Sequence, residues 1–163
     1  MTPDDVPPMT LLALGSNLGD RHAALLDAQA RLEAAGVRVL QASSVHETPA
    51  LMPEGAPADW ARAYLNQVLR VQTALAPHEL LRALKHIETT MGRRPAERWA
   101  PRVIDIDILD HEGHCLADGQ LELPHAQMHL RRFVMAPLCE VAPDWVHPRL
   151  RRSARQILQE LPA

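Results

Sequence analysis

Hydrophobic and polar positions alternate most regularly over residues 103–109. Isoleucines occupy one parity of this segment and two aspartates the other, namely Ile104, Ile106 and Ile108 against Asp105 and Asp107. In a β-strand this pattern places the isoleucines on one face and both carboxylates on the opposite face. Two residues of rise separate the aspartate backbones by roughly 7 Å. The pattern predicts a strand that buries isoleucine and presents paired carboxylates.

Similar patterns predict the elements that precede this strand. The apolar run 10–14 predicts a strand, and Asp20 is a candidate N-cap for a helix that ends at Gly36. We expect further strands at 37–45 and 64–73, joined by a proline-rich loop at 47–63. A second helix should begin at Pro77 and end at Gly92, with an apolar stripe of Leu80, Leu84, Ile87 and Met91.

The resulting order is strand, helix, strand, strand, helix, strand. This order is typical of an α+β fold with a ferredoxin-like βαββαβ core, in which two helices cover one face of a mostly antiparallel sheet. The C-terminal part adds a short strand at 120–123, a helical segment from Arg131 interrupted at Pro137, and a last helix capped by Ser153 with Gln156. We expect a frayed lead-in at 1–9 and a single domain at 10–163.

Composition narrows the function classes. The chain has 163 residues, 47% of them hydrophobic, and a net charge of −3 from 17 basic and 20 acidic residues. With this net charge, the chain has no overall positive potential of the kind that favours nucleic-acid binding. No apolar run reaches membrane-spanning length. Cys115 and Cys139 form no C-x-x-C pair, so a reduced, cytoplasmic setting is the default. The expected partners are small molecules, and the expected state is a monomer.

Four arginines precede the carboxylate pair and suggest its chemistry: Arg93, Arg94, Arg98 and Arg102. Guanidinium groups beside two carboxylates suit a metal-bound polyphosphate. The alternative is an edge strand with a polar outer face and a solvated arginine loop, and a D-x-D motif alone favours that alternative. The turn at residues 15–21 carries no G-K-[ST], so we interpret it as a tight turn that uses Gly15 and Gly19 for backbone freedom.

Aromatic residues are scarce, with one tyrosine and one phenylalanine. If Tyr64 and Phe133 face each other, they form a slot for a flat heterocycle, with Asn66 near enough to hydrogen-bond its edge. Core packing of the two rings is the alternative. His125 lies six residues before Arg131, and both could reach the same anion.

Together these segments resemble the 6-hydroxymethyl-7,8-dihydropterin pyrophosphokinase family. The resemblance is carried by L-A-L-G-S-N-L-G-D-R (12–21), S-S-V-H-E-T-P (43–49), Y-L-N (64–66), E-R-W-A-P-R-V-I-D-I-D-I (97–108) and L-P-H-A-Q-M-H-L-R-R-F-V (123–134). It implies transfer of pyrophosphate from ATP to the hydroxymethyl group of the pterin, with release of AMP. Asp105 and Asp107 would then hold two Mg²⁺ ions on the ATP phosphates.

The resemblance also implies roles for other residues. Those expected to bind the pterin are Thr48, Pro49, Leu51, Tyr64, Asn66, Trp99 and Phe133. Those expected on the nucleotide side are Glu88, Trp99, Arg102, Ile108, His125 and Arg131. Arg93 and Arg102 would stabilise the transferring group.

The sequence departs from the family pattern at Lys85, Pro95, Ala100, Gln120, Glu122 and Ala126. These departures bear on closure of the loops and on nucleotide affinity, and they leave the metal pair and the pterin slot intact. Two other function classes stay open from the residues alone. A non-catalytic ferredoxin-like module would explain the fold and the slot but not carboxylates beside arginines. A metal-dependent phosphohydrolase would need a water-activating base, and none is evident.

Overall fold

The structure is a computed structural model that describes residues 9–49, 54–58, 62–92 and 101–162. Its elements follow in this order: β1 (Thr10–Ser16), α1 (Arg21–Ala34), β2 (Val37–Ala42), β3 (His46–Thr48), β4 (Tyr64–Thr73), α2 (Pro77–Thr90), β5 (Asp105–His111), β6 (Leu116–Ala117), β7 (Glu122–Leu123), a 3-10 turn (Met128–Leu130), α3 (Arg132–Val141) and α4 (Ala154–Glu160).

The main sheet has the strand order β2-β4-β1-β5, and every neighbouring pair is antiparallel. The short strand β3 pairs with β4 beyond the end of β2, and β6 with β7 forms a separate two-stranded sheet. Because each helical connection passes over an intervening strand, this is the split βαβ topology of the ferredoxin-like fold. The structure therefore confirms the predicted fold class.

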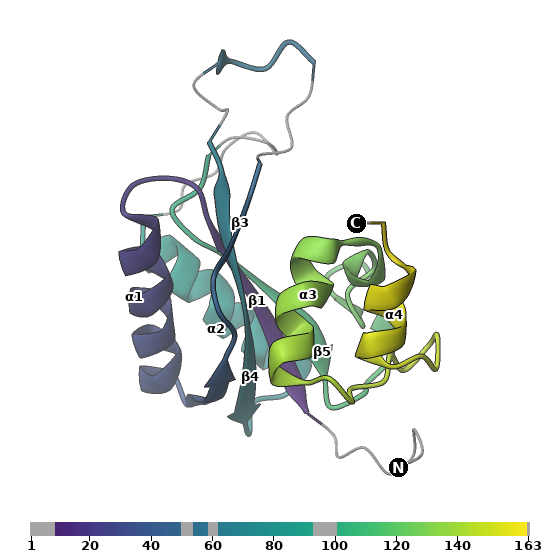
Figure 1. Ribbon diagram of the computed structural model, residues 1–163. Coiled ribbons are helices and arrows are strands. Elements are labelled where there is room, and N and C mark those ends of the chain that lie inside the picture. The colour runs from purple at the N-terminus through teal and green to yellow at the C-terminus, as the bar shows by residue number, and fades with distance from the viewer. Residues whose placement is uncertain (1–8, 50–53, 59–61, 93–100, 163) are drawn as a thin grey trace.

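Helices α1 and α2 cover one face of the sheet (Figure 1). The Asp20 carboxylate caps α1 by accepting a 3.0 Å hydrogen bond from the N–H of Ala23, and Pro77 begins α2. The core between helices and sheet contains all three isoleucines of the alternating segment, at most 4% exposed, as the sequence predicts. The opposite parity of β5 therefore faces away from this core.

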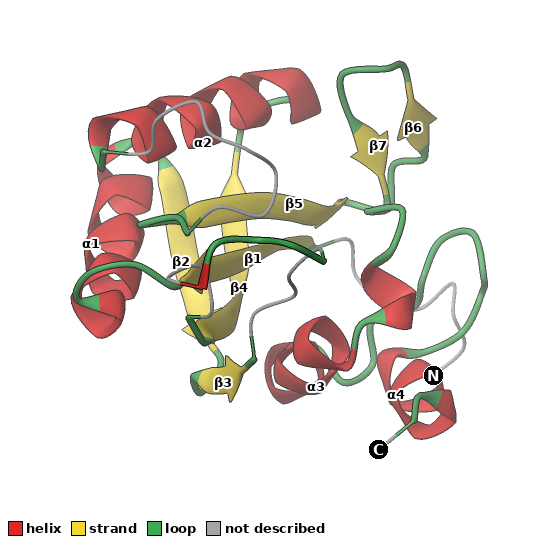
Figure 2. Cartoon of the chain, turned by 90° about the horizontal axis from the view of Figure 1, so that it is seen from above, coloured by secondary structure: helices red, strands yellow, loops and turns green. Residues whose placement is uncertain are grey.

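A second core lies on the other face of the sheet, where α3 and α4 pack (Figure 2). Leu11, Val68 and Leu109 from β1, β4 and β5 are buried there against Val134 and Leu138 of α3. Figures 1 and 2 both show that these helices cover only part of this face. The uncovered part carries the side chains of Asp105 and Asp107.

Three predictions about the elements need correction. The strand predicted at 37–45 ends at Ala42, and a separate strand, β3, extends from His46 into the segment 47–63 that was predicted as a loop. The helix predicted to break at Pro137 continues through it to Val141. Pro137 removes one backbone donor, but its neighbours Val134, Leu138 and Val141 are buried in the second core, and this packing keeps the segment helical.

Two further predictions concern the ends of the chain and membranes. Residues 1–8 of the predicted lead-in lie outside the described residues, whereas Met9 packs against the second core. The longest described helices, α1 and α2, have 14 residues each. Among the described residues, none of the helices combines the length and the apolar character that crossing a membrane requires.

Candidate active site

A cavity of about 570 Å³ opens over the uncovered part of the sheet, between β1, β4, β5 and α3. It gathers ten of the residues that the sequence singled out: Thr48, Pro49, Tyr64, Asn66, Arg102, Asp105, Asp107, His125, Arg131 and Phe133. These residues come from segments up to 85 positions apart in the chain. The fold therefore brings the predicted metal pair, the predicted pterin residues and most predicted phosphate contacts into one space.

The carboxylate pair lies on β5 where this strand meets β1. Asp105 is opposite Gly15 and Asp107 is opposite Ala13, so both side chains leave the sheet on the side of the cavity. Alternation along the strand fixes this geometry, because the intervening Ile106 is buried on the other face. Two carboxylates two residues apart can share one hard cation or hold two adjacent ones.

The Asp107 carboxylate is buried and lies near other negative charges. Burial, together with the nearby Asp105 and Glu88 carboxylates, raises the pKa of Asp107 to about 7, while Lys85 and Arg131 oppose the increase. A divalent cation between the two aspartates would relieve this repulsion. Within the described residues no group of three or more His, Cys, Asp or Glu side chains could hold a metal ion. A two-carboxylate site is still suited to Mg²⁺, which keeps water and substrate phosphates as its other ligands.

Arg102 lies beside this pair, three residues before β5 begins. Its Nη1 is 3.5 Å from Oδ1 of Asp105, and its side chain is 20% exposed. The Arg102 backbone is fixed by Asn17, whose Oδ1 accepts a 2.7 Å hydrogen bond from the Arg102 N–H. A guanidinium group held next to a carboxylate can bind phosphate oxygens that the cation also contacts.

His125 and Arg131 line the side of the cavity that faces α3. The Nδ1 atom of His125 accepts a hydrogen bond of 3.2 Å from the N–H of Gln127, and burial together with Arg131 lowers the pKa of His125. His125 is therefore a neutral donor through Nε2 at neutral pH. The Arg131 guanidinium lies 5.6 Å from the centre of the Phe133 ring and donates a 2.8 Å hydrogen bond to Gln127 Oε1. Both groups can donate to an anion.

The predicted heterocycle slot has a polar edge. Asn66 Nδ2 donates to Thr48 Oγ1 at 2.7 Å and to the backbone carbonyl of His46 at 3.2 Å. These bonds orient the Asn66 amide, which lines the cavity together with the Tyr64 and Phe133 rings. The amide Oδ1 and the Thr48 hydroxyl are placed where they can hydrogen-bond the edge of a flat ring.

Two residues expected on the nucleotide side lie elsewhere. Ile108 is buried in the core under α1 and α2. Glu88 is also buried there: it accepts a 2.8 Å hydrogen bond from the N–H of Ile106 and lies 3.4 Å from Lys85 Nζ. The structure does not bring either residue into the cavity lining, and their nucleotide roles stay predictions. Leu51, Arg93 and Trp99 lie outside the described residues.

The sequence reasoning missed two residues of the site. Gly15 is not a turn residue as predicted but lies inside β1 and lines the cavity, where an added Cβ would be 3.5 Å from Tyr64 Cδ1. Only Gly19, with a φ of +73°, uses the backbone freedom expected for this segment. Asn17, which holds Arg102, was passed over as part of the turn. A glycine inside a strand pattern was the available signal for close approach of a ligand or side chain.

Comparison with known proteins identifies relatives of this chain. The family model described as 7,8-dihydro-6-hydroxymethylpterin-pyrophosphokinase (HPPK) matches residues 11–143. A Methylorubrum extorquens protein named 2-amino-4-hydroxy-6-hydroxymethyldihydropteridine pyrophosphokinase is 44% identical over 137 residues, which are 83% of each chain. A Bacillus subtilis protein of the same name is 41% identical and aligns over 80% of this chain and 75% of its own.

Solved structures give the same fold. The chain is similar to a crystal structure of wild-type Plasmodium falciparum HPPK-DHPS, with a TM-score of 0.71 and 14% sequence identity. The alignment covers 95% of this chain and 45% of that longer chain. With the family model spanning most of the sequence and relatives above 40% identity, the chain belongs to the 7,8-dihydro-6-hydroxymethylpterin pyrophosphokinase family.

Proposed function

We propose that this cavity is the active site at which the chain transfers pyrophosphate from ATP to 6-hydroxymethyl-7,8-dihydropterin and releases AMP. Membership of the family supports the reaction. The single observation that carries the assignment of the site is the pair Asp105 and Asp107 beside Arg102, in the same cavity as Tyr64 and Phe133. A heterocycle slot and a polyphosphate site then adjoin each other, as transfer between two bound substrates requires.

Asp105 and Asp107 are the residues that would hold Mg²⁺, and we propose two ions. When bound, magnesium screens the charge on the phosphate oxygens and helps to align the attacking and leaving oxygens. Both carboxylates lie on one face of β5, where their mutual repulsion favours binding of a cation. Lys85, which offsets part of the negative charge at Asp107, would bear on metal affinity.

The remaining polar residues bind and orient the nucleotide. Arg102 is positioned to contact the oxygens of the transferring group, and Arg131 with His125 would contact phosphates from the α3 side. The reaction is a displacement at the β-phosphorus by the pterin hydroxyl, so most of the protein's contribution is positioning and charge stabilisation. The family resemblance adds Arg93 and Trp99 to this group, and Glu88 and Ile108 to the nucleotide side.

The pterin would lie between the rings of Tyr64 and Phe133, with Asn66 and Thr48 at its edge. The hydrogen bond from Asn66 to Thr48 supports this assignment, because it leaves the amide oxygen free to accept from a ring N–H. Pro49 and, from the resemblance, Leu51 would close the same side. We further propose that the enzyme acts as a monomer in the cytoplasm, which size-exclusion chromatography and fractionation can test.

One assay tests the reaction against its alternatives. The protein is incubated with Mg·ATP and hydroxymethyl-dihydropterin, and the nucleotides and pterins are separated and identified by mass. The proposal predicts AMP and pterin diphosphate in equal amounts, with neither formed when the pterin is omitted. Formation of ADP and free phosphate without a pterin product would favour a phosphohydrolase. Pterin binding without any nucleotide turnover would favour a non-catalytic module.

A further inference from the structure

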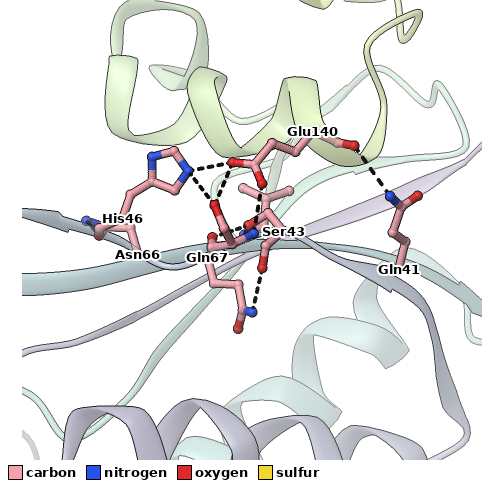
Figure 3. Close-up of polar contacts among 8 residues, drawn as sticks. Gln41, Ser43, His46, Asn66, Gln67 and Glu140 are labelled. Atoms are coloured by element: carbon pink, nitrogen blue, oxygen red, sulfur yellow. Dashed lines mark hydrogen bonds and ion pairs between the residues drawn. The ribbon is translucent and has the colours of Figure 1, made fainter.

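A polar cluster joins the C-terminal end of α3 to the segment between β2 and β3 (Figure 3). The Glu140 carboxylate accepts from the backbone N–H of Ser44 at 2.9 Å and from the Ser44 hydroxyl at 2.9 Å. It also lies 2.6 Å from His46 Nε2. The Glu140 side chain thus contacts Ser44 and His46, both of which precede it by more than 90 positions.

This segment leads directly into the proposed pterin pocket. The backbone carbonyl of His46, the residue whose ring contacts Glu140, accepts from Asn66 Nδ2 at 3.2 Å. Two residues later Thr48 accepts from the same amide at 2.7 Å, and both Asn66 and Thr48 line the cavity. Glu140 is therefore two contacts removed from the polar edge of the slot, and its side-chain hydrogen bonds with described residues involve Ser44 and His46.

The strand that carries Thr48 depends on such contacts. β3 has three residues and pairs with β4 on one side, as His46 with Asn66 and Thr48 with Tyr64. Short segments with few ladder hydrogen bonds belong to the least stable part of a fold. Figure 2 shows β3 lying close to α3, and the contact between His46 and Glu140 is a polar contact between them. Hydrogen bonds to an ionised carboxylate are stronger than neutral ones.

The other wall of the slot belongs to the same helix as Glu140. Phe133 lies near the beginning of α3 and lines the cavity, seven residues or about 10 Å along the helix from Glu140. Because a helix of this length moves as a unit, a contact at its end constrains the position of Phe133. Glu140 is thus connected to both walls: to Phe133 through α3, and to Thr48 and Asn66 through β3.

We propose that Glu140, acting through Ser44 and His46, is a positioning residue that sets the geometry between Phe133 and the Asn66–Thr48 edge of the pterin slot. The inference rests on the proposed function, since it assigns the slot to the pterin. It predicts that loss of the Glu140 carboxylate weakens pterin binding selectively, because the metal pair and Arg102 lie on β5 and its approach and are held by other contacts.

The test measures binding of hydroxymethyl-dihydropterin by its fluorescence, with Mg²⁺ and a non-hydrolysable ATP analogue present. We expect Glu140→Ala to raise the Kd for pterin about five- to ten-fold, the effect of losing about one hydrogen bond, and to leave the Kd for the ATP analogue within about two-fold. Glu140→Gln keeps the acceptor for the Ser44 N–H and should recover much of the loss. His46→Ala should weaken pterin binding too, with less than additive effect in the double variant.

Glu33 provides a matched control. It is also a helix glutamate whose carboxylate accepts from a strand backbone, the N–H of Val39 at 2.8 Å, but β2 carries no lining residue of the cavity. Glu33→Ala should leave the pterin Kd unchanged even if the melting temperature of the protein decreases.

The inference is overturned if a folded Glu140→Ala variant binds pterin like the wild type, or if Glu33→Ala weakens pterin binding equally. If Glu140→Ala does not fold, His46→Ala decides by the same criterion. A wild-type chain that binds no pterin overturns the proposed function as well, whereas an active wild type with unaffected variants overturns this inference alone.

Discussion

Asn17 and Arg102 hold each other through their backbones and one side chain. Asn17 Oδ1 accepts from the Arg102 N–H at 2.7 Å, and the Asn17 N–H donates to the Arg102 carbonyl at 3.1 Å. Asn17 Nδ2 lies 3.4 Å from the carbonyl of Arg62. A buried residue of the turn after β1 thus anchors the segment that enters β5 and reaches the segment that enters β4.

Replacing this anchor should affect catalysis more than binding of the pterin. We expect Asn17→Ala to lower the free energy of unfolding by about 1–2 kcal/mol, because the partly buried Arg102 N–H loses its acceptor. The variant should also lower kcat about ten-fold, since Arg102 beside Asp105 is no longer fixed. Denaturant unfolding and single-turnover kinetics measure the two effects. Asn17→Asp keeps the acceptor and is the control. A folded Asn17→Ala variant with wild-type kcat would argue against the anchoring role.

Gly15 offers a test that separates stability from binding. An added methyl would lie 3.5 Å from Tyr64 Cδ1 and 3.8 Å from Asn66 Oδ1, which are ordinary contact distances, so Gly15→Ala should fold without strain. The methyl would occupy the cavity floor beside the slot, and we expect the KM for pterin to rise about ten-fold while the melting temperature stays the same or increases slightly. Gly36→Ala is a poor control, because Gly36 has a φ of +85° and a substitution there would strain the backbone. Ala13→Gly is a better control, because it enlarges the part of the cavity that Gly15 also lines. Tighter pterin binding by Gly15→Ala would contradict the assigned slot.

Removal of one carboxylate should abolish turnover. We expect Asp107→Asn to reduce the rate of AMP formation by at least about a thousand-fold, because the metal pair loses a ligand that the transition state needs. Binding of the pterin should largely survive, since Tyr64 and Phe133 are unchanged. Fluorescence titration and the AMP assay measure the two properties. Asp27→Asn, on the exposed side of α1, is the matched control and should leave both at wild-type values.

The raised pKa of Asp107 gives a pH prediction for the metal-free protein. Because the folded pKa is about 7 and the usual value is 3.8, the folded state binds more protons than the unfolded state between these limits. Stability from this group is therefore present below about pH 4 and decreases as the pH rises towards 7. Asp107→Asn should flatten that part of the profile of unfolding free energy against pH. An identical slope in the variant and the wild type would show that another group is responsible.

His147 should produce the opposite slope at lower pH. Burial lowers the pKa of His147 to about 4, with His129 and Arg149 contributing, and its Nδ1 accepts hydrogen bonds from the N–H groups of Arg149 and Leu150. Because the folded pKa lies below the ordinary 6.5, the unfolded state binds more protons between pH 6.5 and 4. Stability should thus fall from pH 7 to pH 4 through this group. His147→Asn should reduce the difference between unfolding midpoints at these two pH values; an undiminished difference would refute the attribution.

Local patterns in the sequence predicted much of the fold. The alternation at 104–108 placed the isoleucines and aspartates on opposite faces correctly, and β4 has the predicted bounds 64–73. Side chains that act on their own neighbours, such as Asp20 as the cap of α1, were equally predictable. The grouping of Tyr64, Phe133 and the aspartates in one cavity followed from family resemblance and is a property of the folded chain.

What the sequence did not predict depends on contacts between distant segments. β3 lies in a proline-rich stretch with no alternating pattern, and it is a strand because β4 offers it an edge and Glu140, 94 residues from His46, binds it. Pro137 breaks an isolated helix, yet burial against the second core maintains α3 through it. Asn17 resembled any turn asparagine until the fold placed Arg102, 85 residues away, beside it.

The most direct test of the central claim is to locate divalent cations by anomalous diffraction. Crystals of the protein with a non-hydrolysable ATP analogue, hydroxymethyl-dihydropterin and Mn²⁺ in place of Mg²⁺ would be measured at the manganese edge. The account predicts two anomalous peaks within coordination distance of the Asp105 and Asp107 carboxylates, bridging to the phosphates of the nucleotide. Peaks confined to other residues, with a bound nucleotide and no metal at this pair, would contradict it.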